Sequence, residues 1–283
     1  MSLSHGGVEI GQGIHTKVSQ VCAYELGIPL ESISIKPCNS FNNPNGQATG
    51  GSITSELCSM AVIECTKIIN TNLAPIRKLM PPNYTWLDLI QKAFSMGVDL
   101  SAHYWLYPPA LQQPFQYNVY GAACTEALVD VLTGETQILR TDILYDGGQS
   151  LNAEIDIGQA EGAFIMGLGF WLLEKFRYDP NTGKCLTNGT WEYKPPMSKD
   201  IPIDFRITFL RNNPNPLGVL GSKCIGEPPL CLTPSVAFAV KRAIESARSE
   251  VGKDTFFVLN SPATVESIQQ LCLVDYSQFR FND

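Results

Sequence analysis

Apolar residues recur at helical spacing in several stretches of the chain. Between residues 15 and 25 they fall near every third or fourth position, and Gly27 follows as a natural C-terminal cap. Proline and hydroxyl residues mark other helix starts, because both suit the first positions of a helix. The spacing therefore predicts further helices over 52–70, from Thr85 to near Gly97, over 153–176, from Thr233-Pro234 onward, and over 261–271.

Strands are predicted where β-branched and aromatic residues gather or alternate with polar ones. Segments 117–131 and 137–145 flank Thr133-Gly134-Glu135, which is typical of a hairpin turn. Shorter strands are expected over 32–36 and 203–210, with a small hairpin around 181–183. Residues 39–51 hold four Asn, three Gly and one Pro, which predicts an irregular loop. The whole pattern indicates an α+β fold with mixed sheets and packed helices.

Four glycines interrupt the helix expected over 153–176, namely Gly158, Gly162, Gly167 and Gly169. Each costs up to about 1 kcal/mol relative to alanine inside a helix. We therefore expect another element or a ligand to approach that face closely.

Composition narrows the class of protein. The chain has 283 residues, 17% charged against about 25% in typical globular proteins, so disorder and coiled coil are excluded. The net charge is -7 and no long basic run occurs, which argues against a nucleic-acid partner. Nine cysteines stand alone without a Cys-x-x-Cys pair, so no iron–sulfur ligand set can be written. With no apolar run of about 20 residues, we expect a cytoplasmic protein with reduced thiols and no membrane partner.

Two glycine-rich segments precede predicted helices. In 6–15 the glycines and the following helix start could form an anion cradle or a plain turn, and Gln12 would offer an amide to something polar. The segment fails as a dinucleotide fingerprint because Thr16 takes the place of the third glycine. In 47–54, Ser52 and Thr54 could simply cap a helix. Two such loops in fifty residues favour one shared anionic ligand.

Glu227 lies between Gly226 and two prolines. Proline fixes its own φ and restricts the residue before it, so this carboxylate has little backbone freedom, as suits an aimed general base. An exposed loop acid is the alternative.

Three separated motifs carry a family resemblance, in register: GGVEIGQGIHTK at 6–17, GQAEGAF at 158–164 and GSKCIGEPPL at 221–230. Together they resemble the molybdenum-binding part of the xanthine dehydrogenase and aldehyde oxidase family, from about residue 5 to 275. The segment 190–206 is more similar to animal aldehyde oxidases than to xanthine dehydrogenases.

The resemblance implies a site for molybdenum and its pterin. Glu227 matches the general base that takes a proton from the Mo–OH group, whose oxygen attacks an aldehyde carbon while hydride passes to the sulfido ligand. Gly51 falls next to the metal. Cofactor contacts are implied at Ile10, Gln12, Gly51, Ser52, Ile53, Thr54, Cys124, Gln159 and Ile225.

Family members also carry two 2Fe-2S clusters and FAD, pass electrons to O2, and form homodimers. This chain lacks the cysteines for the clusters, so we expect residues 1–283 to be the C-terminal part of the molybdopterin-binding domain, partnered by the rest of the same polypeptide. Alone it is expected to bind cofactor poorly and to oxidise no aldehyde or N-heterocycle. The alternatives are part of a xanthine dehydrogenase, acting on hypoxanthine or xanthine with NAD as acceptor, and a non-catalytic remnant.

Overall fold

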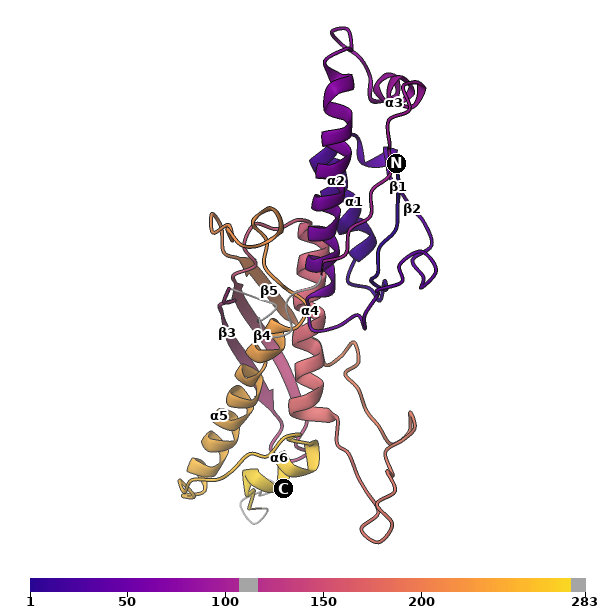
Figure 1. Ribbon diagram of the computed structural model, residues 1–283. Coiled ribbons are helices and arrows are strands. Elements are labelled where there is room, and N and C mark those ends of the chain that lie inside the picture. The colour runs from indigo at the N-terminus through magenta and orange to yellow at the C-terminus, as the bar shows by residue number, and fades with distance from the viewer. Residues whose placement is uncertain (107–116, 276–283) are drawn as a thin grey trace. The chain divides into compact units, whose positions relative to one another are not determined.

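The computed structural model describes residues 1–106 and 117–275, and the chain forms two compact units (Figure 1). The first unit comprises Met1–Asn118, Gly148–Asp156 and Asn212–Cys224. The second comprises Val119–Gly147, Ile157–Arg211 and Ile225–Asp283. Each unit has its own apolar core.

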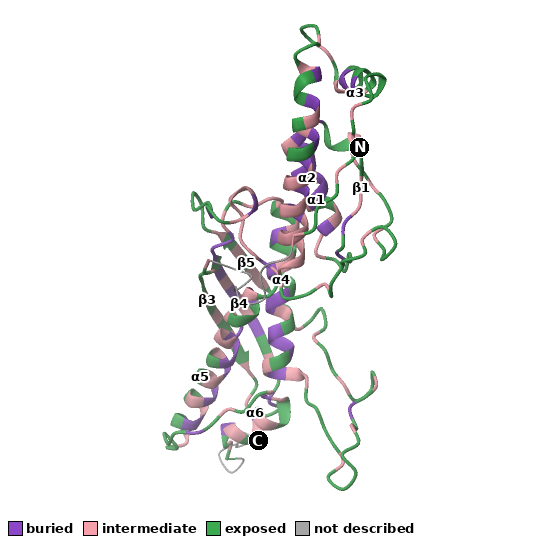
Figure 2. Cartoon of the chain, viewed as in Figure 1, coloured by how far each residue is buried: buried purple, intermediate pink, exposed green. Residues whose placement is uncertain are grey.

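Three helices build most of the first unit: α1 (Ile14–Leu26), α2 (Thr54–Arg77) and α3 (Trp86–Ser95). Helices α1 and α2 lie side by side, and their buried faces, purple in Figure 2, form the core with Leu89 and Ala93 of α3. Strand β1 (Ser2–Leu3) pairs in parallel with β2 (Ser34–Ile35).

The helix ends of the first unit follow the sequence closely. Gly27 caps α1 with a left-handed φ of 66°. Thr85 and Asp88 form a reciprocal capping box at the start of α3. The predicted C-terminal end of α1 and the predicted start of α3 are therefore confirmed. Two bounds differ: α2 continues past residue 70 and contains Pro75, and the strand expected over 32–36 is cut to two residues by a 3₁₀ turn at Leu30–Ser32.

The second unit contains a mixed three-stranded sheet in the order β3–β4–β5. Strands β3 (Gly121–Val129) and β4 (Thr136–Tyr145) are antiparallel and joined at the predicted hairpin, where Gly134 has a φ of 79°. Strand β5 (Asp204–Phe209) runs parallel to β4. The α+β class with a mixed sheet is therefore confirmed.

Helices pack their apolar residues against this sheet. They are α4 (Ala153–Leu168), continued by a π-helical turn at Gly169–Leu173, α5 (Pro234–Glu250) and α6 (Val265–Cys272). Residues 153–156 of α4 belong to the first unit. The core of the second unit joins Phe164 and Leu168 of α4, Val240 of α5, and Ile143 and Tyr145 of β4.

The four glycines of α4 and of the π-helical turn that follows it only partly meet the expectation of a close neighbour. A Cβ at Gly167 would collide with the Thr233 side chain, and one at Gly169 would lie 2.7 Å from Pro196. At Gly158 and Gly162 nothing lies within 4 Å of such an atom, so close packing explains two of the four glycines.

All nine cysteines lie in the described part of the chain, and each is a free thiol. Among the described helices, none combines the length and apolar character that crossing a membrane requires.

Candidate functional site

The two glycine-rich loops meet in the first unit. The Val8 N–H donates to Thr49 Oγ1 at 2.9 Å, which links residues 41 positions apart. The backbones also approach closely, because a Cβ placed on Gly6 would lie 3.3 Å from the Gly46 Cα. Two loops that are remote in sequence thus form one surface, as a shared ligand requires.

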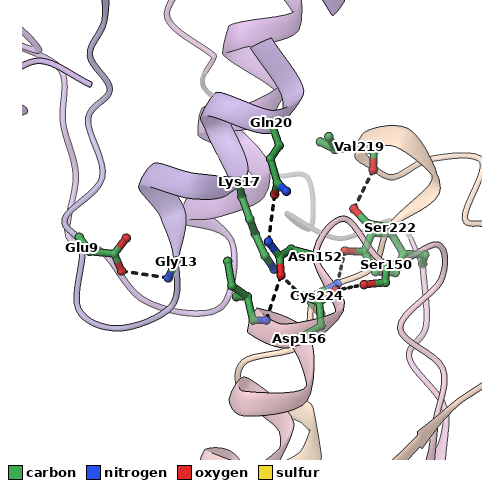
Figure 3. Close-up of polar contacts among 12 residues, drawn as sticks. Glu9, Gly13, Lys17, Gln20, Ser150, Asn152, Asp156, Val219, Ser222 and Cys224 are labelled. Atoms are coloured by element: carbon green, nitrogen blue, oxygen red, sulfur yellow. Dashed lines mark hydrogen bonds and ion pairs between the residues drawn. The ribbon is translucent and has the colours of Figure 1, made fainter. Parts of the chain in front are cut away.

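The carboxylate of Glu9 accepts hydrogen bonds from backbone N–H groups in the loop before α1 and in the first turn of α1. Its Oε1 accepts hydrogen bonds from the N–H groups of Gly13 at 2.9 Å (Figure 3) and Gly11 at 3.0 Å, and its Oε2 accepts one from the His15 N–H at 3.2 Å. Partial burial alone would raise the pKa of Glu9, but these three hydrogen bonds outweigh it and hold the pKa below its ordinary value. The expectation of an open anion cradle at this helix is therefore corrected: the chain fills it with its own carboxylate.

Gln12 turns its amide back onto the loop. Its Oε1 accepts from the Ile10 N–H at 2.7 Å, and its Nε2 donates to the Val8 carbonyl at 2.8 Å. The amide expected to be offered to a ligand therefore already shapes the backbone between these residues. The Ile10 side chain remains 70% exposed.

The second loop enters α2 through two left-handed residues. Gly51 has a φ of 66° and Ser52 a φ of 55°, a region that side chains other than glycine rarely adopt. Neither Ser52 nor Thr54 occupies the N-cap position, which falls to Ile53 and carries no side-chain hydrogen bond. Thr54 Oγ1 instead accepts from the Gly50 N–H at 3.3 Å. The capping interpretation is thus wrong, and α2 begins without a side-chain cap.

A pocket of about 150 Å³ adjoins these loops within the first unit. The Asn43 side chain lines it, and the Oδ1 atom of Asn43 is buried without a hydrogen-bond partner. Most buried polar atoms in proteins are satisfied, so this acceptor calls for a donor that the described chain does not supply. The pocket is further lined by Gly6, residues 44–48, Ile53, Thr54, Leu57, Cys58, Ala61 and residues 103–106.

Glu56 lies in the first turn of α2 and accepts a hydrogen bond from the Tyr117 hydroxyl at 2.6 Å. Burial raises the pKa of Glu56, and the hydrogen bond only partly offsets that rise. Burial therefore disfavours a negative charge on this side chain at the start of α2.

An ion pair fastens α1 to the segment 148–156. Lys17 Nζ lies 2.6 Å from Asp156 Oδ1, and Ser150 Oγ donates to Asp156 Oδ2 at 2.7 Å (Figure 3).

Gly13 lies where the first loop enters α1 and has a φ of 72°. A Cβ there would lie 2.5 Å from Ile155 Cδ1, so this position needs glycine for both its φ and its neighbour.

Three of the expected cofactor contacts lie in the second unit. Cys124 is exposed on β3, opposite Asp142 of β4. Gln159 is half-buried on α4, whereas Ile225 is 5% exposed and belongs to the unit's core.

Glu227, the expected base, also lies in the second unit and is exposed there. Its backbone is helical, with φ -107° and ψ -36°, contrary to the extended conformation that a following proline favours. The reason is a 3₁₀ turn at Pro228–Leu232, in which the Leu230 N–H donates to the Glu227 carbonyl at 3.0 Å. The two prolines therefore fix the carboxylate in a turn, but its own unit does not bury it.

The structure thus places the expected site residues in two sets. The first unit brings together Ile10, Gln12 and residues 51–54, and the second unit holds Cys124, Gln159, Ile225 and Glu227. Sequence reasoning missed Glu9, Thr49 and Asn43. An acid between glycines gave a signal for Glu9, but nothing in the sequence marked Asn43.

The residues of the first unit fit a pterin cofactor that carries phosphate. The start of α2 presents backbone N–H groups without a side-chain cap, and glycine and left-handed backbone precede it. The unpartnered Asn43 Oδ1 suits an N–H donor, which pterin rings supply.

Comparisons with known proteins agree with this fit. The family model described as "Molybdopterin cofactor-binding domain" matches residues 1–202. The chain is 41% identical over 286 residues to the xanthine dehydrogenase/oxidase of Mus musculus, covering 97% of this chain and 21% of that protein. It is 39% identical over 298 residues to the indole-3-acetaldehyde oxidase of Arabidopsis thaliana, covering 98% and 22%.

A solved structure shows the same fold. The aldehyde oxidoreductase of Desulfovibrio gigas superposes with a TM-score of 0.70 at 23% identity, covering 93% of this chain and 28% of that one. The chain spans about a fifth of the length of the curated relatives it matches. By the match over residues 1–202 it belongs to the molybdopterin cofactor-binding domains of the xanthine dehydrogenase and aldehyde oxidase family.

Proposed function

We propose that the first unit binds the molybdenum cofactor through the two glycine loops and the start of α2, in a whole protein that oxidises small aldehydes to carboxylic acids. The observation that carries this proposal is the uncapped N-terminus of α2, which follows Gly51 and Ser52 and lies beside the first loop. Helix N-termini of this kind bind phosphate.

Each residue has a proposed part in this function. Ser52, Ile53 and Thr54 present the N–H groups of the helix start to phosphate, and Gly51 lies beside the metal. Ile10 and Gln12 line the cofactor from the first loop. Cys124, Gln159 and Ile225 are proposed as further contacts on the family resemblance alone.

When bound, the molybdenum cofactor supplies the two-electron redox chemistry of hydroxylation. The part of this chain is then to accept a proton, and Glu227 is the proposed base.

The aldehyde is proposed from segment 190–206, which resembles aldehyde oxidases. A second candidate, hydroxylation of hypoxanthine or xanthine with NAD as acceptor, is favoured by relatives named xanthine dehydrogenase at 40–43% identity. For the whole protein we further propose 2Fe-2S clusters and FAD that carry electrons to O2, a homodimer, and a cytoplasmic location.

The test is to purify the whole protein, measure its molybdenum and pterin content, and compare turnover of an aromatic aldehyde with that of xanthine. Stoichiometric molybdenum with turnover of the aldehyde supports the proposal. Turnover of xanthine alone would transfer the assignment to the second candidate. A protein without molybdenum or pterin would overturn both.

A further inference from the structure

Two histidines and a cysteine converge beside the first glycine loop. They are His5, His15 and Cys38, and one potential ligand atom from each lies within 4.8 Å of the others. Within residues 1–106 and 117–275 this is the one such cluster of His, Cys, Asp and Glu. It lies wholly in the first unit and has no part in the function proposed above.

Regular structure holds the three side chains in place. Strands β1 and β2 are parallel with Leu3 opposite Ile35, so His5 and Cys38 both follow the carboxyl end of this strand pair. A hydrogen bond from the Lys36 N–H to the Leu3 carbonyl, 2.7 Å long, extends the pairing towards them. His15 comes from the first turn of α1.

The hydrogen bonds of the cluster define where its protons are. The Gly7 N–H donates to His5 Nδ1 at 3.2 Å, so this nitrogen carries no proton. The His5 proton therefore lies on Nε2, which is 2.8 Å from His15 Nδ1 and donates to it. His5 is only 5% exposed, so water has little access to the shared proton.

We propose that His5 Nε2, His15 Nδ1 and Cys38 Sγ form a binding site for a borderline-soft divalent metal ion such as Zn²⁺. Two imidazoles and one thiolate are ligands that zinc and cobalt prefer over magnesium and calcium. In a tetrahedral site with metal–ligand distances of about 2.0–2.3 Å, neighbouring ligand atoms lie roughly 3.3–3.8 Å apart. The two imidazole nitrogens need only separate by about half an ångström to reach that spacing.

Metal binding at these three atoms displaces one proton to solvent. The Cys38 thiol loses its proton and binds as a thiolate, while the His5 proton moves from Nε2 to Nδ1, so that both imidazoles bind as neutral ligands. The Gly7 N–H then loses its hydrogen bond to His5 Nδ1. A divalent ion with one thiolate leaves a single positive charge on the site.

The experiment uses the full 283-residue chain, stripped of metal with a chelator and titrated with Co²⁺ and then with Zn²⁺. We expect one tight Co²⁺ site per chain with a thiolate-to-cobalt charge-transfer band in the near ultraviolet. Zn²⁺ should displace the Co²⁺, and binding should release about one proton per metal ion, read with a pH indicator in weak buffer.

Matched variants assign the ligands. Cys38→Ser and Cys38→Ala should lose the charge-transfer band and weaken Zn²⁺ binding at least about tenfold. Cys231→Ser and His103→Ala, which alter an exposed cysteine and the remaining histidine, should bind as the wild type does. Since His5 is buried and its replacement risks unfolding, His15→Asn tests the histidine side, with circular dichroism as the check on folding.

Two results would overturn the proposal. One is a wild-type chain that takes up no Co²⁺ with a thiolate band. The other is a folded Cys38→Ser variant that keeps both the band and the wild-type affinity. Neither result bears on the molybdenum content of the whole protein, so the two proposals stand or fall separately.

Discussion

Lys17 and Asp156 are 139 residues apart in sequence, yet Lys17 Nζ lies 2.6 Å from Asp156 Oδ1. The Lys17 side chain is 13% exposed and that of Asp156 is 1% exposed, so both charges are largely removed from water. Removing one member of such a pair leaves an unpaired buried charge. The pair therefore holds segment 148–156 on α1, directly after the first glycine loop.

We predict that Lys17→Met and Asp156→Asn each lower the free energy of unfolding by about 3–5 kcal/mol, measured by urea denaturation. The double variant should lose much less than the sum, because it leaves no charge without its partner. Lys67→Met, which breaks the exposed pair with Glu64, serves as the control and should change the free energy of unfolding far less than either buried substitution, because solvent screens exposed charges. Additive effects of the two buried substitutions would refute this account.

Gly13 and Gly27 allow the cost of a positive φ to be separated from the cost of a close neighbour when glycine is replaced by alanine. Both have φ near 70°, but a Cβ at Gly13 would lie 2.5 Å from Ile155 Cδ1, whereas nothing lies within 4 Å of one at Gly27. Gly27→Ala should therefore cost about 1–2 kcal/mol from the left-handed backbone alone. Gly13→Ala should cost more than that in the same thermal unfolding assay. Equal losses would show that the loop yields around Ile155.

Glu56 should make stability depend on pH. Burial raises the pKa of Glu56 in the folded chain, partly offset by the Tyr117 hydroxyl, so folding favours the protonated form. Its contribution to stability is complete below the unfolded pKa of about 4.3 and is lost as pH rises through the higher folded value. Glu56→Gln stays neutral and can still accept the hydrogen bond. It should gain stability over the wild type between pH 4 and pH 7.

Urea denaturation at pH 4, 5.5 and 7 measures this difference. If the Glu56→Gln variant loses stability relative to the wild type as pH rises, the sign of the argument is wrong.

Glu227→Gln tests the proposed base in the whole protein. The amide cannot accept the proton, so kcat with an aldehyde should fall by about 100- to 10,000-fold while molybdenum content is unchanged. Glu135→Gln, an exposed acid on the β3–β4 hairpin, should leave both unchanged. Activity within tenfold of the wild type would remove Glu227 from the mechanism.

The sequence predicted the ends of those helices that are capped by residues close by in the sequence. Gly27 ends α1 and Thr85 begins α3 because a left-handed cap and a capping box involve only a few consecutive residues. The parallel pairing of β5 with β4 was not predictable in this way, since it joins strands about sixty residues apart. The continuation of α2 through Pro75 likewise depends on packing, because Leu73 and Ile76 are buried in the core.

The candidate site shows the same division. Motifs located both glycine loops, and the structure shows a close neighbour at two of their glycines: the Gly46 backbone at Gly6 and the Ile155 side chain at Gly13. The motifs do not show which side chains accept hydrogen bonds from the backbone N–H groups at the two helix starts. Glu9 fills the start of α1, whereas no side chain caps α2. The hydrogen-bond partner of each backbone N–H group can be identified only from the three-dimensional structure.

The amide of Gln12 bridges Val8 and Ile10, and the carboxylate of Glu9 gathers three further N–H groups of the same loop. Five hydrogen bonds from two side chains thus give residues 8–15 their shape without any ligand. A ligand that meets a loop already folded loses little conformational entropy on binding. Its association rate is then governed by diffusion and orientation, so deleting the Glu9 carboxylate, which is not a proposed cofactor contact, should slow binding of the ligand by loosening the loop.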